Sequence, residues 1–186
     1  MTLSNFSSGF DYGHRERISE KYTSSVLNKS KLKACLYLHI LLWLFILLKN
    51  IESLLDYVDI NFPPIVEIYA NRIPNPQIWE YAFLLSIVPT IFALLSLSRN
   101  NKYLLWSFII GQSALGLLPL LGTAILNIPS FKKYVYYRIS PRFFNLPNII
   151  ILYIFISFSL QIIVFSLYFS FKLLQFWKNN TNKKII

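Results

Sequence analysis

Apolar and polar residues follow one another along this chain in long blocks. Four apolar blocks cover roughly residues 34–55, 79–98, 103–126 and 149–174, and polar stretches separate them. A helix needs about 20 predominantly apolar residues to cross the roughly 30 Å of hydrocarbon in a membrane. The pattern therefore predicts an all-α membrane protein built as a bundle of four transmembrane helices. Composition supports this class, because only 14% of the residues are charged, against about 25% in soluble domains.

The second apolar block is the most informative stretch. No charge stands between residues 81 and 98, and Trp79 precedes this run at the position of a headgroup-anchoring aromatic residue. Arg99 and two asparagines end the block, and the next apolar block begins at residue 103. This predicts a tight turn between the second and third spans. Pro89 lies in the middle of the second span and predicts a bend there.

Residues 1–33 form a predicted N-terminal tail, which precedes a transmembrane domain over 34–174 and a C-terminal tail over 175–186. We expect residues 1–13 to be disordered. Ile18, Tyr22 and Val26 recur every fourth residue, which predicts a short amphipathic helix lying on the membrane surface and running into the first span. The first 30 residues lack the apolar run of a cleavable signal peptide, so the first span is the expected insertion signal.

The formal net charge of +10 is unevenly distributed. Residues 81–186 hold ten Lys or Arg and no acid, and these charges flank the predicted spans rather than forming one patch. Binding to anionic lipid headgroups explains them better than binding to nucleic acid. The N-terminal tail, the 99–102 turn and the C-terminal region with Lys172 hold twelve Lys or Arg, and the other two connections with Lys49 hold six, which predicts both termini in the cytosol.

Polar residues inside the spans are few. His39 and Gln112 are predicted to form hydrogen bonds between helices, and Ser107 with Gly111 forms a small-xxx-small pair that favours close helix contact. Cys35 stands at the membrane boundary, where it is either palmitoylated or a small unmodified residue. With two histidines and one cysteine, the sequence predicts no metal site, no cofactor and no enzyme.

The segment between the first two predicted spans, residues 56–78, is a long connection. It holds three acidic residues and four prolines, which exclude one long helix across it. No role for this segment follows from the sequence.

Several motifs resemble the Jagunal family of endoplasmic-reticulum (ER) membrane proteins. The family pattern W-E-Y, then a central proline, then R-N-N is matched by Trp79, Glu80, Tyr81, Pro89, Arg99, Asn100 and Asn101, and H-R-E-R is matched by His14, Arg15, Glu16 and Arg17. The resemblance implies an ER membrane protein that organises the ER and supports early secretory vesicle traffic, with membrane lipids, coatomer and secretory cargo as candidate partners. The H-R-E-R cluster is then a candidate partner-binding surface, although a solvated basic tail explains the same residues. The alternative function is a small four-helix channel, transporter or lipid-handling protein.

Lys183 and Lys184 occupy the fourth and third positions from the last residue of the sequence. Two ammonium groups on flexible stems can meet an acidic receptor pocket, and a nearby carboxylate marks the chain end. Together with the resemblance, the pair predicts a retrieval signal read by coatomer. The alternative is that the lysines only hold the last helix in orientation.

Overall fold

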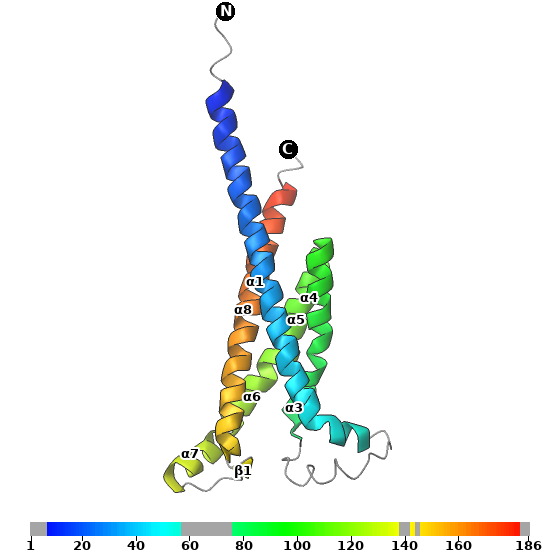
Figure 1. Cartoon of the computed structure of the whole chain (residues 1–186), viewed down its shortest axis with the longest axis vertical. Helices are drawn as coiled ribbons and strands as arrows, with labels where there is room; N and C mark the ends of the chain where they lie inside the picture. The colour runs from blue at the N-terminus through cyan, green and yellow to red at the C-terminus, as the bar shows by residue number, and fades with distance from the viewer. Residues whose placement is uncertain (1–6, 57–75, 138–141, 144–145, 183–186) are drawn as a thin grey trace, which may run out of the picture.

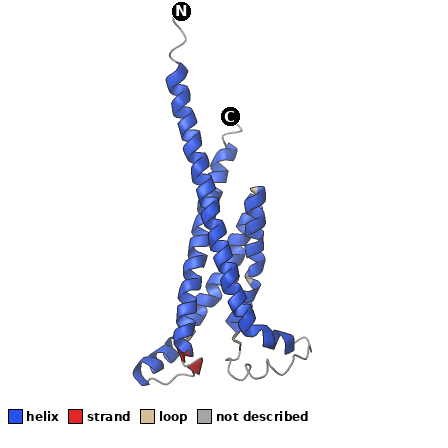
Figure 2. Ribbon diagram, in the orientation of Figure 1, coloured by secondary structure: helices blue, strands red, loops and turns tan. Residues whose placement is uncertain are grey.

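Long helices dominate the computed structural model, which describes residues 7–56, 76–137, 142–143 and 146–182 (Figures 1 and 2). In chain order the elements are α1 (Ser7–Asp56), α3 (Ile78–Leu85), α4 (Ile87–Arg99), α5 (Lys102–Gln112), the π-helix η1 (Ser113–Leu117), α6 (Leu118–Leu126), α7 (Ile128–Tyr137), β1 (Arg142–Phe143), β2 (Leu146–Pro147) and α8 (Asn148–Asn182).

Four helical stretches are long and apolar enough to cross a membrane within the described part of the chain. They are Tyr22–Ile51, Ile78–Arg99, Lys102–Leu126 and Asn148–Lys178. The second stretch combines α3 with α4, and the third combines α5, η1 and α6. The predicted all-α membrane fold with four spanning helices is confirmed.

Helix α1 differs from its prediction at the N-terminal side. It begins at Ser7 and continues to Asp56 without a break, so the expected disorder is wrong for residues 7–13. The segment predicted as an amphipathic helix is helical, but it is the first part of α1 rather than a separate element. Figure 1 shows it continuing along the direction of the span, because no proline or glycine interrupts α1 between residues 14 and 56.

The second span is interrupted at Ser86, as Pro89 predicts. Proline has no N–H group, so the carbonyl of Leu85 loses its helical donor, and the proline ring crowds that carbonyl. Helix α3 therefore ends at Leu85, and α4 begins at Ile87. The N–H of Ser86 donates instead to the carbonyl oxygen of Phe83 at 3.1 Å.

The third span changes its winding before Pro119. The five residues of η1, Ser113–Leu117, form a π-helix between α5 and α6. Such wider turns accommodate a proline ring that would otherwise meet the carbonyl four residues earlier. Gly116 faces the side chain of Gln112, and a Cβ placed on Gly116 would lie 2.8 Å from Gln112 Nε2.

The turn between α4 and α5 explains the two consecutive asparagines. Asn100 adopts the left-handed conformation with φ of 52°, which asparagine tolerates better than most residues. The Asn101 side chain caps α5 by accepting a hydrogen bond from the N–H of Tyr103 at 2.9 Å. The hydroxyl of Ser96 donates to the carbonyl of Asn101 at 2.7 Å. The predicted tight turn is confirmed.

The bundle has two ends, here called the Asn100 end and the Lys49 end. The Asn100 end comprises the α4–α5 turn, the first part of α1 and the last part of α8 (Figure 1). The Lys49 end comprises α7, the beginnings of α3 and α8, and the last turns of α1 (Figure 1). Near the Asn100 end, Lys29 Nζ donates to Asn100 Oδ1 at 2.5 Å and lies 5.8 Å from the centre of the Trp177 ring. These contacts tie α1 to both α8 and the turn.

Two clusters of buried apolar side chains hold the helices together. The cluster toward the Asn100 end includes Leu32, Leu36, Leu97, Leu105, Phe108, Leu173 and Trp177. The cluster toward the Lys49 end comprises Ile46, Trp79, Phe83, Leu120, Ile156 and Ile163. Every spanning stretch contributes to at least one cluster, so the four helices pack as one bundle.

Small residues allow α4 and α5 to approach closely. A Cβ placed on Gly111 would lie 2.9 Å from Pro89 Cβ, closer than carbon atoms can pack. The prediction that Gly111 allows close helix contact is confirmed. Ser107 is exposed, so the prediction is wrong for that member of the pair.

The connection between the third and fourth spans contains helix α7 rather than only a loop. None of its residues is buried. Phe131 packs against Tyr153 of α8 with ring centres 5.0 Å apart, while Lys132 and Lys133 are exposed. A short antiparallel pairing of β1 with β2 precedes α8.

Candidate functional site

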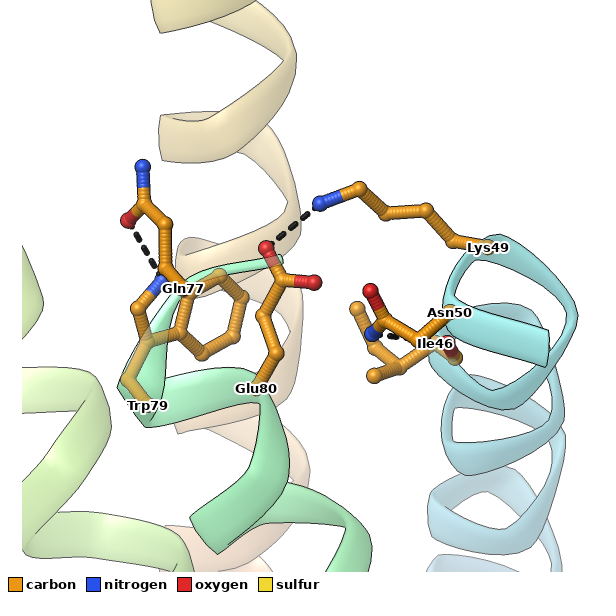
Figure 3. Close-up of polar contacts among 6 residues, drawn as sticks. All are labelled: Ile46, Lys49, Asn50, Gln77, Trp79 and Glu80. Atoms are coloured by element: carbon orange, nitrogen blue, oxygen red, sulfur yellow. Dashed lines mark hydrogen bonds and ion pairs between the residues drawn. The ribbon is translucent and has the colours of Figure 1, made fainter. Parts of the chain in front are cut away.

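A buried carboxylate marks the Lys49 end of the bundle. Glu80 lies in the first turn of α3 and is 2% exposed. Lys49 reaches it from α1, and its Nζ lies 2.5 Å from Glu80 Oε1 (Figure 3). The Lys49 side chain is 25% exposed, so one partner faces the surroundings while the other is enclosed. A carboxylate in the first turn of a helix also interacts favourably with the helix dipole.

The side chains beside this ion pair make hydrogen bonds and ring contacts of their own. The Trp79 indole Nε1 donates to Gln77 Oε1 at 2.8 Å, and Asn50 Nδ2 donates to the carbonyl oxygen of Ile46 at 3.1 Å (Figure 3). The Trp79 ring packs against Phe155 of α8 with centres 6.0 Å apart. The side chains next to Glu80 are thus themselves tied down, and Trp79 links the start of α3 to α8.

A cavity of about 370 Å³ opens beside Glu80, between α1, α3 and α8. Its lining has aromatic, aliphatic and polar members: Phe45, Ile46, Lys49, Gln77, Trp79, Glu80, Asn148, Ile151, Leu152 and Phe155. This volume lies within the range of small-molecule sites, which are mostly apolar with a few placed polar groups.

A second polar group lies deeper, where three spans meet. His39 Nε2 lies 3.0 Å from Ser86 Oγ and 3.5 Å from Gln112 Nε2. The Ser86 hydroxyl also donates to the Phe83 carbonyl at 2.5 Å. The predicted role of His39 and Gln112 in bonding between helices is confirmed. Both are almost fully buried, and this cluster fixes the break at Ser86 against α1 and α5.

The residues of the W-E-Y to R-N-N pattern fall at three places. Trp79 and Glu80 belong to the cavity, Pro89 contacts Gly111, and Asn100 with Asn101 forms the α4–α5 turn. Tyr81 is 39% exposed, and Arg99 is exposed at the end of α4. The pattern is therefore not one site, and most of its residues have a structural role.

The predicted partner-binding residues His14, Arg15, Glu16 and Arg17 all lie in the first part of α1. Arg15 and Glu16 are exposed, and Figure 1 shows this part of α1 reaching beyond the other helices. Lys183 and Lys184 lie outside the described residues, as does most of the 56–78 segment. No three His, Cys, Asp or Glu side chains gather as a metal-binding group in the described ranges.

Lys49 is the site residue that sequence reasoning did not assign. It stands at the far end of the first apolar block, and Glu80 stands at the start of the second. Two helices that follow each other across a membrane bring such ends to the same side. Opposite charges at adjoining ends of consecutive spans are therefore the signal that could have found the pair.

The fold is that of a polytopic α-helical membrane protein, because four helices are long and apolar enough to span a membrane. A buried ion pair and an amphipathic cavity lie together at one end of its bundle. A family model described as "Jagunal, ER re-organisation during oogenesis" matches residues 4–181. The chain belongs to the Jagunal family. Membership, together with the apolar helices, fits a multi-pass protein of the ER membrane.

Individual relatives align over almost the whole chain. "Protein jagunal homolog 1" of Mus musculus is 29% identical over 177 residues, which cover 95% of this chain and 91% of the mouse protein. "Protein jagunal homolog 1-B" of Danio rerio is 32% identical over 181 residues, with coverage of 95% and 91%. "Protein jagunal" of Drosophila melanogaster is 30% identical over 182 residues, with coverage of 93% and 90%. These names describe no reaction.

Proposed function

We propose that this protein organises the ER membrane and supports vesicle-mediated transport in the early secretory pathway, with coatomer as a partner. The family description, ER re-organisation, supports the organising role. The structural observation that carries the proposal is the part of α1 outside the span. A protein that organises a membrane system needs a surface that partners can reach, and this segment offers one.

The arm, defined as residues 7–21 of α1, precedes the candidate span that begins at Tyr22. At about 1.5 Å per residue it is roughly 22 Å long. It carries exposed groups of both charge signs at Arg15 and Glu16. Charges held on a helix at fixed spacing favour specific recognition over non-specific attraction.

The position of α1 and α8 in the bundle supports a cytosolic location for both chain termini. The first residues of α1 and the last described residues of α8 lie at the same end (Figure 1). That end also carries Arg99 and Lys102 of the α4–α5 turn. Lys and Arg concentrate on the cytosolic side of membrane proteins, so we propose that both termini face the cytosol.

Substitution of the charged cluster on the arm should separate function from folding. We expect Arg15→Ala, Glu16→Ala and Arg17→Ala together to leave thermal unfolding nearly unchanged. The cluster precedes the span, Arg15 and Glu16 are exposed, and substitutions at exposed positions usually change stability by about 0.5 kcal/mol or less. The same variant should fail to restore ER morphology in cells that lack the protein. Glu20→Ala, an exposed charge on the same arm, is the matched control. Full rescue by the triple variant would contradict partner binding by this cluster.

Extension of the chain beyond Ile186 tests the coatomer interaction. Three added glycines keep every charge but move the terminal carboxylate away from Lys183 and Lys184. We expect the extended protein to lose coatomer binding in pull-downs and to reach later secretory compartments. A tag at either end should also be digested when protease is added to intact microsomes.

Two outcomes of this extension experiment would count against the proposal. If the extended chain stays in the ER and still binds coatomer, Lys183 and Lys184 are not its retrieval signal. If a terminal tag is protected from protease, the lysines face the lumen and coatomer cannot reach them. Lys172→Ala removes a charge from α8 away from the last residues and should leave coatomer binding intact, which separates a signal at the chain end from the total basic charge.

The cavity beside Glu80 favours one of the alternative functions, a lipid-handling membrane protein. Its lining residues all lie at the Lys49 end of the bundle. The arm lies at the opposite end (Figure 1). A lipid bound there is therefore compatible with partner binding at the arm, and the two roles can be tested apart.

A further inference from the structure

A polar pocket lies between α1 and α8 near the Asn100 end of the bundle. Its volume is about 430 Å³, and Lys31 of α1 and Lys172 of α8 both line it. The two helices run side by side here (Figure 1), and Lys31 Nζ lies 5.9 Å from the centre of the Phe169 ring of α8. One pocket wall thus holds lysines from the first and the last span.

These two lysines have no carboxylate partner. Within the described ranges no acid forms an ion pair with Lys31 or Lys172, and both side chains are exposed. Glu20 also lines the pocket, but it stands eleven residues before Lys31 on the same helix. That spacing is about 16 Å along the axis, which exceeds the screening length of roughly 8–10 Å. The end of the pocket at Lys31 therefore holds positive charge that an anion would neutralise.

Asn28 adds a largely buried donor to the same end. It lines the pocket three residues before Lys31 and is 6% exposed. Its side-chain amide forms no hydrogen bond within the described part of the chain. A largely buried amide without a partner is costly and needs an explanation. An acceptor held between Asn28 and Lys31 would satisfy it.

The pocket lies at the depth of the lipid headgroups. Lys31 is nine residues inside the start of the first candidate span, and Lys172 is six residues inside the end of the fourth. Lysines near helix ends extend their ammonium groups to the membrane interface. Leu27 on the pocket wall and Tyr168, whose ring lies 5.9 Å from Lys172 Nζ, are both more than half exposed. Apolar surface next to a cationic pocket suits a lipid better than a soluble anion.

We propose that this pocket binds the phosphate group of an anionic membrane lipid. The phosphate accepts hydrogen bonds from Lys31, Lys172 and the Asn28 amide, and the acyl chains lie in the bilayer beside Leu27 and Tyr168. Basic pockets between spanning helices on the cytoplasmic side commonly bind such headgroups, and the Asn100 end is the side proposed above to face the cytosol. The chemistry of the site does not depend on that orientation, so the inference can be tested apart from the organising role and from coatomer binding.

Competition between lipids with identical acyl chains tests the ligand class. The full chain, purified in detergent, is incubated with equal amounts of phosphatidate and phosphatidylcholine, and bound lipid is counted by native mass spectrometry. We expect phosphatidate to be retained about tenfold more, as hydrogen bonds from charged donors allow. Equal retention of the two lipids would overturn the proposal. Displacement of phosphatidate by millimolar inorganic phosphate would also overturn it, because the pocket would then hold a soluble anion.

Two double variants with the same loss of charge locate the bound phosphate. Lys31→Ala with Lys172→Ala should abolish the preference for phosphatidate. Lys132→Ala with Lys133→Ala removes two exposed lysines of α7 at the Lys49 end and should keep the preference. If both double variants lower it equally, the total charge of the protein and not this pocket selects the lipid.

Asn28→Leu separates a built site from general charge attraction, because it keeps every charge. Loss of one hydrogen bond should lower phosphatidate retention about fivefold, while the unfolding midpoint shows whether the variant is folded. Unchanged retention in the folded variant would contradict a phosphate bound at Asn28. Should Asn28→Leu fail to fold, the two lysine variants still decide the location.

Discussion

Replacing Gly111 by Ala should destabilise the protein although it adds one methyl group. That Cβ would lie 2.9 Å from Pro89 Cβ and 3.2 Å from Pro89 Cγ. A proline ring is part of the backbone and cannot turn aside, so α4 and α5 must separate. Overpacking of this kind costs about 1–3 kcal/mol. We expect the midpoint of thermal unfolding in detergent, followed by circular dichroism, to fall by roughly 3–10 °C.

Gly122→Ala is the matched control for this substitution. Gly122 lies in α6 of the same span, and a Cβ placed there meets no atom within 4 Å. Alanine is the better helix former by about 1 kcal/mol, so this variant should be neutral or slightly stabilised. Equal unfolding midpoints for the two variants would show that α4 and α5 do not pack through Gly111.

Glu80→Leu should have the second large effect, because it leaves Lys49 without its partner. Breaking a buried ion pair costs about 3–5 kcal/mol. Lys49 is a quarter exposed, so water or lipid headgroups reduce that cost, and we expect roughly 1–3 kcal/mol. The free energy of unfolding in mixed micelles with increasing denaturant measures it.

The double variant Lys49→Leu with Glu80→Leu separates the charge effect from lost packing. Removal of both charges leaves no uncompensated ion, and leucine suits the apolar surroundings. The double variant should therefore be more stable than Glu80→Leu alone. If instead the effect of the double variant equals the sum of the effects of Lys49→Leu alone and Glu80→Leu alone, the two residues are not energetically coupled. The contact between them then does not hold α1 against α3.

Hydropathy was sufficient to predict the four spans and the turn between the second and third. A membrane requires each crossing helix to be long, apolar and internally hydrogen-bonded, so the spans leave a strong trace in the sequence. The effect of Pro89 was also predictable, because a proline in a helix always leaves the carbonyl four residues earlier, here that of Leu85, without its N–H donor. The wider turn before Pro119 was not, since a proline can be accommodated by a bend, a break or a π-helix.

The candidate site could be predicted only in part. Trp79 and Glu80 stood out through the resemblance, but their contact with Lys49 depends on how α1 crosses α3. The cavity depends on three helices that diverge toward one end, and residues such as Phe45 and Ile151 look like ordinary lipid-facing positions in sequence. Helix crossing is decided by side-chain packing over the whole bundle, which local patterns do not record.

The uninterrupted course of α1 has a mechanical consequence. At about 1.5 Å per residue, its 50 residues give roughly 75 Å of helix, and only the last turns bend away from the long axis (Figure 1). The second and third spans contain a break at Ser86 and the π-helix η1, which can act as hinges, but α1 contains neither. A force that tilts the arm therefore also moves Lys49 at the far end of the same lever. Whatever pulls on one face of the membrane changes the position of a charge at the other.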